Sequence, residues 1–391
     1  MTPITSTAEL ADFCARLEGQ AFVAVDTEFM RETTYWPKLC LIQAAGANGV
    51  EACIDPLAEG LDLGPFLALM RDTRSLKVFH AARQDVEIFH NLGAIPEPLF
   101  DTQIAGMAAG FGEQVAYDAL VRKILKIEID KSSRFTDWGR RPLSEAQLTY
   151  ALADVTHLAA LYPILRMRLE KAGRMSWVTE EMAAMGDPAL YDMDPEGAWR
   201  RLKPRKHTAK YLAVFRAVAA WRERTAQQRD QPRGRILKDE AIDELAAQAP
   251  VEPDALNRLR SVPKGFAGSR YGPELVDAIR EALRDPEAYA PKLERDTTPV
   301  SPAAGAVVEL LKVLLKARAE EADVASKLIA TVGDLEKIAN DDRADTPALR
   351  GWRREAFGED ALRLKRGELA LVLDGTRVRV VPVRRAAKAT A

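Results

Sequence analysis

Two acidic residues, Asp26 and Glu28, stand two positions apart at the end of the apolar run AFVAV (residues 21–25). The run has the length and composition of a buried strand, and positions i and i+2 of a strand point to the same face of a sheet. Burying acids is costly unless they are paired or hold a cation. Carboxylate oxygens are the ligands that Mg²⁺ and Mn²⁺ prefer. The pair therefore indicates a divalent-metal site, although two acids at an exposed strand end form the same pattern.

Two further acids extend this pattern. Asp85 is expected in the first turn of a helix that directly follows the strand KVFHA (77–81), where an acid also stabilises the helix dipole. Tyr150 and Asp154 are four residues apart on a long helix expected over residues 144–173, so they share a face, as a surface Tyr–Asp pair also does. Four carboxylates from a strand, a helix start and a late helix can converge on one crevice of an α/β domain. Two divalent ions about 4 Å apart in such a crevice support in-line phosphoryl displacement.

The elements that must position these residues follow from the hydrophobic periodicity of the first two hundred residues. Three strand-length runs, AFVAVDTEF, LCLIQAA and VEACID, are close together and predict neighbouring strands joined by hairpins. Two further short strands, in KVFHA and LFDTQ, alternate with helices. This order predicts a mixed sheet with helices packed on its faces, in a domain over residues 1–198.

Beyond residue 198 the strand signals nearly vanish and helical patterns dominate. We interpret residues 199–290 and 303–376 as two diverged copies of one helical module, joined by a Pro-containing linker over 291–302. The basic tail, residues 377–391, is expected to be loose. The segment 200–235 contains twelve Lys or Arg against two acids. It is interpreted either as a solvated face or as a track for RNA.

Composition sets the broad class of the protein. The 391 residues are 47% hydrophobic, and the formal net charge of −2 neither favours nor excludes a nucleic-acid partner. The three cysteines, Cys14, Cys40 and Cys53, form no CxxC motif, which favours a reducing compartment over a disulfide framework. The start of the chain has no signal-peptide pattern, and no apolar run approaches bilayer length. We therefore expect a cytoplasmic protein with no membrane partner, and a monomer because no association helix is evident.

Three segments resemble motifs of a known family. DTEF, HAARQDVEIF and YALADV resemble the three motifs of the DEDD 3′–5′ exonucleases, and a Tyr four residues before the last Asp resembles the DEDDy branch. The stretch TDWGRRPLSEAQLTYALADVTHL (residues 136–158) closely resembles the bacterial ribonuclease D family, and ILKDEAIDELA (236–246) resembles an HRDC domain. The resemblance implies an α/β ribonuclease H-like exonuclease domain followed by two all-α HRDC-like domains.

The resemblance also implies roles for individual residues and a substrate. The family's metal ligands fall on Asp26, Glu28, Asp85 and Asp154, which would hold two Mg²⁺ or Mn²⁺ ions, and Tyr150 would orient the attacking water. Asp26 would contact both ions, Glu28 and Asp154 the first, and Asp85 the second through water. The expected activity is 3′–5′ exoribonuclease trimming of structured RNA with a single-stranded 3′ end, tRNA precursors above all, releasing nucleoside 5′-monophosphates.

Five other residues are candidates for RNA contact, each with a structural alternative. Phe29 is placed to stack on a terminal base or to fill the core. His80 is placed to contact the terminal nucleotide or to end its strand as a hydrogen-bonded histidine. Lys131 lies in a polar loop, and Trp138 and Arg141 precede the third motif, where they either contact RNA or pack against the long helix.

Two other functions fit parts of the pattern. The same acids would serve a DNA exonuclease equally well, because they contact only phosphate and metal. Only a residue that contacts the 2′-hydroxyl distinguishes an RNA exonuclease from a DNA exonuclease. A non-catalytic RNA-binding protein is the third possibility, and such a protein would be expected to lack one of the four acids. A helicase is excluded because the chain has no GxxxxGK[ST] phosphate loop.

Overall fold

The computed structural model describes residues 2–292 and 302–383. Its first part is built on a five-stranded sheet with the strand order β3-β2-β1-β4-β5. β1 pairs antiparallel with β2, and β2 with β3, whereas β4 and β5 run parallel to β1. This confirms the predicted mixed sheet. The strands are β1 (Phe22–Met30), β2 (Lys38–Gly46), β3 (Glu51–Ile54), β4 (Leu76–Phe79) and β5 (Leu99–Asp101).

The pairing of β1 with β2 changes register where the two acids lie. Glu28 is paired with Leu41, but the next residue, Phe29, is paired with Leu39, so Cys40 is an extra residue on β2. Such a bulge bends the strand and re-aims the side chains beside it, and bulges are frequent next to active sites.

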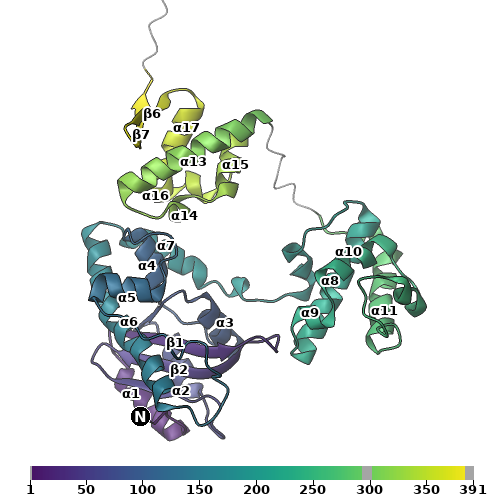
Figure 1. Ribbon diagram of the computed structural model, residues 1–391, viewed down its shortest axis with the longest axis horizontal. Coiled ribbons are helices and arrows are strands. Elements are labelled where there is room, and N and C mark those ends of the chain that lie inside the picture. Colours follow the sequence, from purple (N-terminus) through teal and green to yellow (C-terminus); the bar gives the residue numbers. More distant parts are fainter. Residues whose placement is uncertain (1, 293–301, 384–391) are drawn as a thin grey trace, which may run out of the picture.

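Seven helices surround this sheet (Figure 1). The longest begins after Ser144, whose side chain accepts a hydrogen bond from the backbone N–H of Gln147 in a capping box, as its predicted N-cap role requires. The first and last helices of the set were not predicted. The helices are α1 (Thr7–Leu17), α2 (Gly64–Arg71), α3 (Arg83–Asn91), α4 (Thr102–Ala108), α5 (Tyr117–Leu125), α6 (Glu145–Lys171) and α7 (Met175–Met185).

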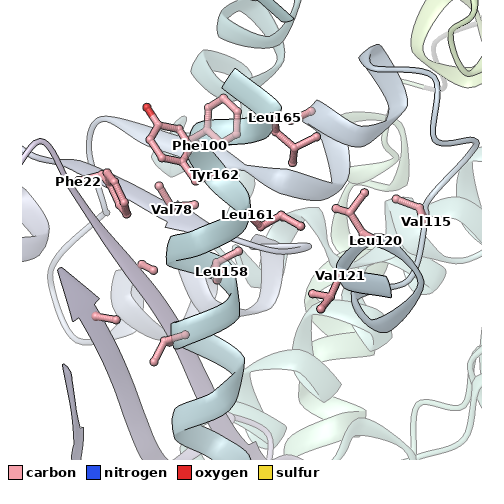
Figure 2. Packing of buried hydrophobic residues seen from close by; sticks show 14 of the residues in the cluster. Phe22, Val78, Phe100, Val115, Leu120, Val121, Leu158, Leu161, Tyr162 and Leu165 are labelled. Carbon is pink, nitrogen blue, oxygen red and sulfur yellow. The ribbon is translucent and has the colours of Figure 1, made fainter. Parts of the chain in front are cut away.

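The helix α6 is the central core helix of this domain. Figure 2 shows Leu158, Leu161 and Tyr162 of α6 between Phe22 of the sheet and the helix α5. Among the described residues, α6 is also the one helix long and apolar enough to cross a membrane, with half of its apolar window buried. The expectation that no apolar run approaches bilayer length therefore needs correction, and the packing explains the apolar composition.

The first helical module forms its own core around one long helix, α8. Buried Val214, Phe215 and Val218 of α8 pack against Ile242 and Ile279. The segment DALNRLRS, predicted to be an α-helix, instead forms a 3₁₀ turn, η3 (Pro253–Arg258). The helices of the module, with the preceding turns, are η1 (Pro188–Leu190), η2 (Pro195–Arg201), α8 (Ala209–Arg229), α9 (Arg233–Ile236), α10 (Asp239–Gln248), α11 (Tyr271–Arg284) and α12 (Pro286–Tyr289).

The second module is helical but ends in a β-hairpin that was not predicted. Two predictions are corrected by β6 and β7: residues 359–371 do not form one helix, and residues 377–382 are not loose. Most of the predicted linker (293–301) and residues 384–391 of the tail lie outside the described residues. The elements are α13 (Pro302–Ala322), α14 (Ser326–Ile329), α15 (Val332–Asn340), η4 (Pro347–Leu349), α16 (Gly351–Arg353), η5 (Arg354–Gly358), α17 (Glu359–Lys365), β6 (Leu369–Asp374) and β7 (Arg377–Pro382).

The second module packs on α4 and α7 of the sheet domain (Figure 1). The rings of Trp177 and Trp352 stack with centroids 4.1 Å apart. The buried Arg353 forms ion pairs with Glu180, at 2.8 Å, and with Glu181. Because these contacts combine a stacked aromatic pair with a buried, doubly paired arginine, they define an ordered contact between the two parts of the chain.

Candidate active site

Three of the predicted acids meet on one face of the sheet. Asp26 and Glu28 extend from the end of β1, and Asp154 faces them from α6. One carboxylate oxygen from each residue lies within 4.8 Å of the others. This is the convergence that the strand and helix spacings predicted, and three hard oxygen donors at this separation fit a divalent cation such as Mg²⁺ or Mn²⁺.

The fourth acid, Asp85, is outside this three-acid group. It lies in the first turn of α3 and is buried. Its Oδ1 accepts a hydrogen bond of 2.5 Å from the Thr27 hydroxyl. Thr27 lies between Asp26 and Glu28 on β1, so its side chain points to the opposite face of the strand. Asp85 therefore approaches the strand end from the other side, and the threonine fixes its orientation.

Burial raises the pKa of every acid in the site, and the charges of neighbouring acids raise the pKa of Glu28, Asp85 and Asp154 further. Burial raises the pKa of Asp26 to about 6. Burial and then the charge of Asp26 raise the pKa of Asp154 to about 8. For Glu28, burial and the charges of Asp26, Asp154 and Asp85 raise the pKa to about 9. The Asp85 pKa is raised well above its ordinary value by burial and Asp26. A bound cation would reverse this balance, because it stabilises the ionised carboxylates.

A cavity of about 400 Å³ opens beside the acids. This volume is within the range of sites that hold small molecules. Its lining includes two of the acids, Asp26 and Asp154, together with an acidic side chain of α5 and basic side chains of the loop that follows α5. The other polar or aromatic lining residues are His80, Gln103, Gln114, Tyr117, Asp118, Lys131, Arg134 and Tyr150.

Two tyrosines frame Asp154 in this cavity. The Tyr150 hydroxyl hydrogen-bonds the Asp154 carboxylate, an interaction that partly offsets the raised pKa of that acid. Burial and the neighbouring carboxylates raise the pKa of Tyr150 itself above its ordinary value. The Tyr117 hydroxyl donates to the backbone carbonyl of Asp154. Both phenols therefore keep their protons at neutral pH and act as hydrogen-bond donors.

Of the five predicted RNA contacts, His80 and Lys131 line the cavity. The Nδ1 of His80 lies 3.0 Å from the Thr102 hydroxyl, and burial lowers its pKa, so the ring is neutral at pH 7. Lys131 forms a 2.6 Å ion pair with Asp118 at the cavity wall. Phe29 is half-buried at the bulge and is not among the lining residues.

The other two predicted RNA contacts are engaged in packing. Trp138 is 4% exposed, and its ring centroid lies 6.2 Å from that of Tyr150. Arg141 donates two hydrogen bonds of 2.6 Å to Asp55 and others to the carbonyls of Trp138 and Cys40. These contacts support the packing alternative for both residues, because they tie the loop before α6 to the sheet.

The sequence patterns did not reveal several residues that shape this site. Thr27 lies inside the DTEF motif, and strand alternation alone would have placed it opposite the two acids. Tyr117 begins a helix in the segment YDALVRKIL, and nothing in its local pattern indicates its contact with Asp154. The partners of Thr27 and Tyr117 are far away in sequence, so no local pattern could identify these two contacts.

Comparison with known proteins agrees with this geometry. Residues 1–170 match the 3′-5′ exonuclease family model, and residues 211–279 match that of the HRDC domain. Ribonuclease D of Nitrobacter hamburgensis is 54% identical over 380 residues, which cover 97% of this chain and 98% of that protein. Ribonuclease D of Granulibacter bethesdensis is 50% identical over 381 residues, covering 97% and 96%.

A solved structure extends the similarity to the whole architecture. The crystal structure of Escherichia coli RNase D, described as an exoribonuclease involved in structured RNA processing, matches with a TM-score of 0.79 at 28% identity. The match covers 93% of this chain and 99% of that one, which confirms the predicted fold class of an exonuclease domain followed by helical modules. With relatives this similar along almost its entire length, the chain belongs to the ribonuclease D family of 3′–5′ exoribonucleases.

Proposed function

We propose that this exoribonuclease trims the 3′ ends of structured RNA, with tRNA precursors as its main substrates, by two-metal hydrolysis that releases nucleoside 5′-monophosphates. The observation that carries the proposal is the group of three carboxylates, Asp26, Glu28 and Asp154, within 4.8 Å of one another beside a cavity of about 400 Å³.

The four acids divide into two sets of metal ligands in this proposal. Asp26, Glu28 and Asp154 would hold the first ion, and Asp26, together with Asp85 through water, would hold the second. Divalent ions in such a site neutralise charge at the phosphate and activate water. The hydrogen bond from Thr27 supports the role of Asp85, because it orients a carboxylate that lies outside the three-acid group.

Tyr150 positions the attacking water in this proposal. Its hydroxyl already donates to Asp154, and its raised pKa argues for hydrogen-bond donation and against proton abstraction. The Tyr117 hydroxyl, which donates to the Asp154 carbonyl, holds the helix turn that carries both residues. The chain thus supplies orientation through its phenols and metal ligands through its acids.

The substrate assignment has two supports. The cavity admits the end of a single strand, and the helical modules provide surface for the folded remainder of an RNA. The similar Escherichia coli protein is described as acting in structured RNA processing. The three cysteines are free and buried, which supports the expectation of a reducing cytoplasm, and we propose that the protein acts as a monomer.

The test uses a 5′-labelled hairpin RNA with a single-stranded 3′ tail and the DNA of the same sequence. We expect shortening of the RNA from its 3′ end with Mg²⁺ or Mn²⁺, none with EDTA, and nucleoside 5′-monophosphates as products. A tRNA precursor should be trimmed to its folded body. Equal digestion of the DNA would contradict RNA specificity and favour a general 3′ exonuclease. Binding of RNA without digestion would favour the non-catalytic alternative.

A further inference from the structure

A hollow of about 530 Å³ lies on the first helical module, between residues 234–240 and the loop 260–264. Its floor contains Ile236, Leu237 and Val262, which are all buried. Exposed cationic side chains of both segments surround this floor. They are Arg235, Lys238, Arg260 and Lys264, and the lining also includes one exposed acid, Glu240.

None of these four side chains forms an ion pair within the part of the chain that the structure describes. The basic segment 200–235 behaves differently, because most of its arginines are used internally. Arg201 and Arg233, for example, pair with Glu223, and Arg222 pairs with Asp239. The hollow thus gathers four exposed cations without an ion pair in the described residues, one of which, Arg235, also ends the basic segment. Other exposed cations of that segment that form no ion pair in the described residues are Arg200, Lys203, Lys206, Lys210 and Arg229.

Both walls of the hollow are held in place by hydrogen bonds. The carboxylate of Glu244 accepts from the backbone N–H groups of Arg260 and Ser261, at 2.9 and 2.7 Å. The buried Arg222 donates to the Leu237 carbonyl at 3.0 Å and to Asp239 at 2.6 Å. The backbone that carries the four cations is thus fixed in advance, which lowers the entropic cost of binding a ligand.

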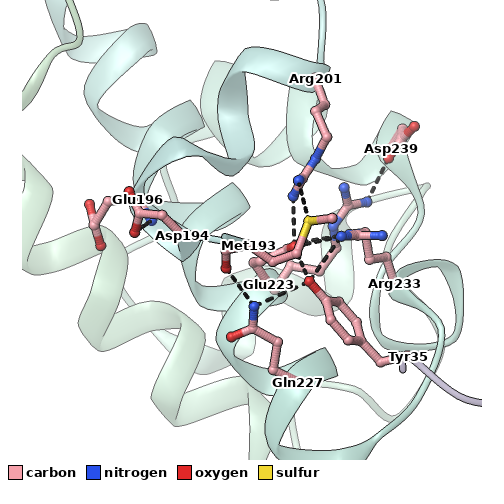
Figure 3. Close-up of polar contacts among 10 residues, drawn as sticks. Tyr35, Met193, Asp194, Glu196, Arg201, Glu223, Gln227, Arg233 and Asp239 are labelled. Atoms are coloured by element: carbon pink, nitrogen blue, oxygen red, sulfur yellow. Dashed lines mark hydrogen bonds and ion pairs between the residues drawn. The ribbon is translucent and has the colours of Figure 1, made fainter. Parts of the chain in front are cut away.

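The wall of the hollow formed by α9 is also tied to the strand that bears the catalytic acids (Figure 3). Tyr35 lies in the connection from β1 to β2, and its hydroxyl donates to Glu223, a fully buried acid of α8. Arg233 of α9 forms ion pairs with the same Glu223 at 2.6 Å. Asp230 accepts from the backbone N–H groups of Tyr35 and Trp36, both at 3.0 Å. The hollow and β1 therefore hold a fixed relation to each other.

We propose that this hollow anchors phosphates of the folded part of an RNA whose 3′ end occupies the active-site cavity. The inference rests on the proposed function, since it concerns the same substrate. Four cations that form no ion pair within the described residues offer charge complementarity to a phosphodiester backbone, and such contacts position an RNA without reading its sequence. The hydrogen bond between Tyr35 and Glu223 keeps the folded part of the RNA at a fixed distance from the catalytic acids.

The test replaces all four cations, in the variant Arg235→Gln/Lys238→Gln/Arg260→Gln/Lys264→Gln. The probes are a hairpin RNA with a 3′ tail and a dinucleotide of the tail sequence. We expect the KM for the hairpin to rise at least about tenfold, and the salt slope of hairpin binding to fall by about 1 for each phosphate that the variant no longer neutralises. Turnover of the dinucleotide should not change, because it does not reach the hollow.

A matched control removes two Arg and two Lys that line no hollow: Arg16→Gln/Lys171→Gln/Lys316→Gln/Arg343→Gln. These side chains are exposed, and the control should bind the hairpin almost as the wild type does. An unchanged KM in the hollow variant, or an equal rise in KM in the control, would overturn the proposal. Failure of the proposed function is distinguishable, because it would abolish dinucleotide hydrolysis in the wild type as well.

Discussion

Replacing Asp154 with Asn should stabilise the metal-free protein while abolishing its activity. Asp154 is 8% exposed, and burial with the charge of Asp26 raises its pKa from 3.8 to about 8. One pKa unit corresponds to about 1.4 kcal/mol, so the ceiling on the cost of this acid at pH 7 is about 4 kcal/mol. Relaxation of neighbouring acids makes the stabilisation by Asn smaller than this ceiling. We expect the free energy of unfolding to rise by about 2 kcal/mol, which corresponds to a rise in Tm of about 4–8 °C.

The pH dependence of this gain has a definite sign. A raised pKa means that the folded state binds the proton more tightly than the unfolded state does. The wild type therefore loses stability as pH rises from 3.8 towards about 8. Asn cannot titrate, so the difference in Tm between variant and wild type should be near zero at pH 4 and largest near pH 8.

The assay is thermal unfolding in excess EDTA across this pH range, repeated with Mn²⁺. Added Mn²⁺ should stabilise the wild type and have little effect on Asp154→Asn, because the variant lacks one ligand. Asp12→Asn, on the exposed face of α1, is the control and should show neither effect. A variant less stable than the wild type in EDTA at pH 8 would refute the reasoning that repulsion and burial destabilise the empty site.

Three more outcomes follow from single contacts. Thr27→Val removes the hydrogen bond to Asp85 and should lower kcat about tenfold with a loss of unfolding free energy of about 1 kcal/mol; an unchanged kcat would contradict the orienting role. Tyr150→Phe should lower kcat while leaving the Mn²⁺ affinity, measured by titration, unchanged. A parallel loss of Mn²⁺ affinity would contradict the water-positioning role and show that Tyr150 supports metal binding. Glu223→Gln should lower the unfolding free energy by about 3 kcal/mol, because two arginines lose a buried partner. It should also raise the KM for a hairpin RNA with a 3′ tail. An unchanged KM would show that the contacts of Glu223 with Tyr35 and Arg233 do not contribute to substrate binding.

The sequence predicted the features that depend on local pattern. Strand-length apolar runs identified the mixed sheet, and Ser144, predicted as an N-cap, identified the start of α6. The i, i+2 spacing of Asp26 and Glu28 placed both acids on one face, where the structure brings Asp154 to meet them.

Contacts between distant segments could not be predicted from the sequence. The hydrogen bond from Thr27 to Asp85 joins residues 58 apart, and that from Tyr35 to Glu223 joins residues 188 apart. The sequence could not show which arginines of the basic segment 200–235 are paired, because their acidic partners, such as Asp239, lie outside it or are buried. The hairpin of β6 and β7 was missed because a helical period in residues 359–365 was extended into it.

The most direct test of the central claim counts the Mn²⁺ ions bound by the wild type and by Asp26→Asn, from the signal of free Mn²⁺ in electron paramagnetic resonance. Asp26 is the acid assigned to both ions, and it lies in the three-carboxylate group. The account predicts two ions bound by the wild type and a loss of both sites in the variant. Equal binding by the two proteins would contradict the claim that these carboxylates form the metal-dependent catalytic centre.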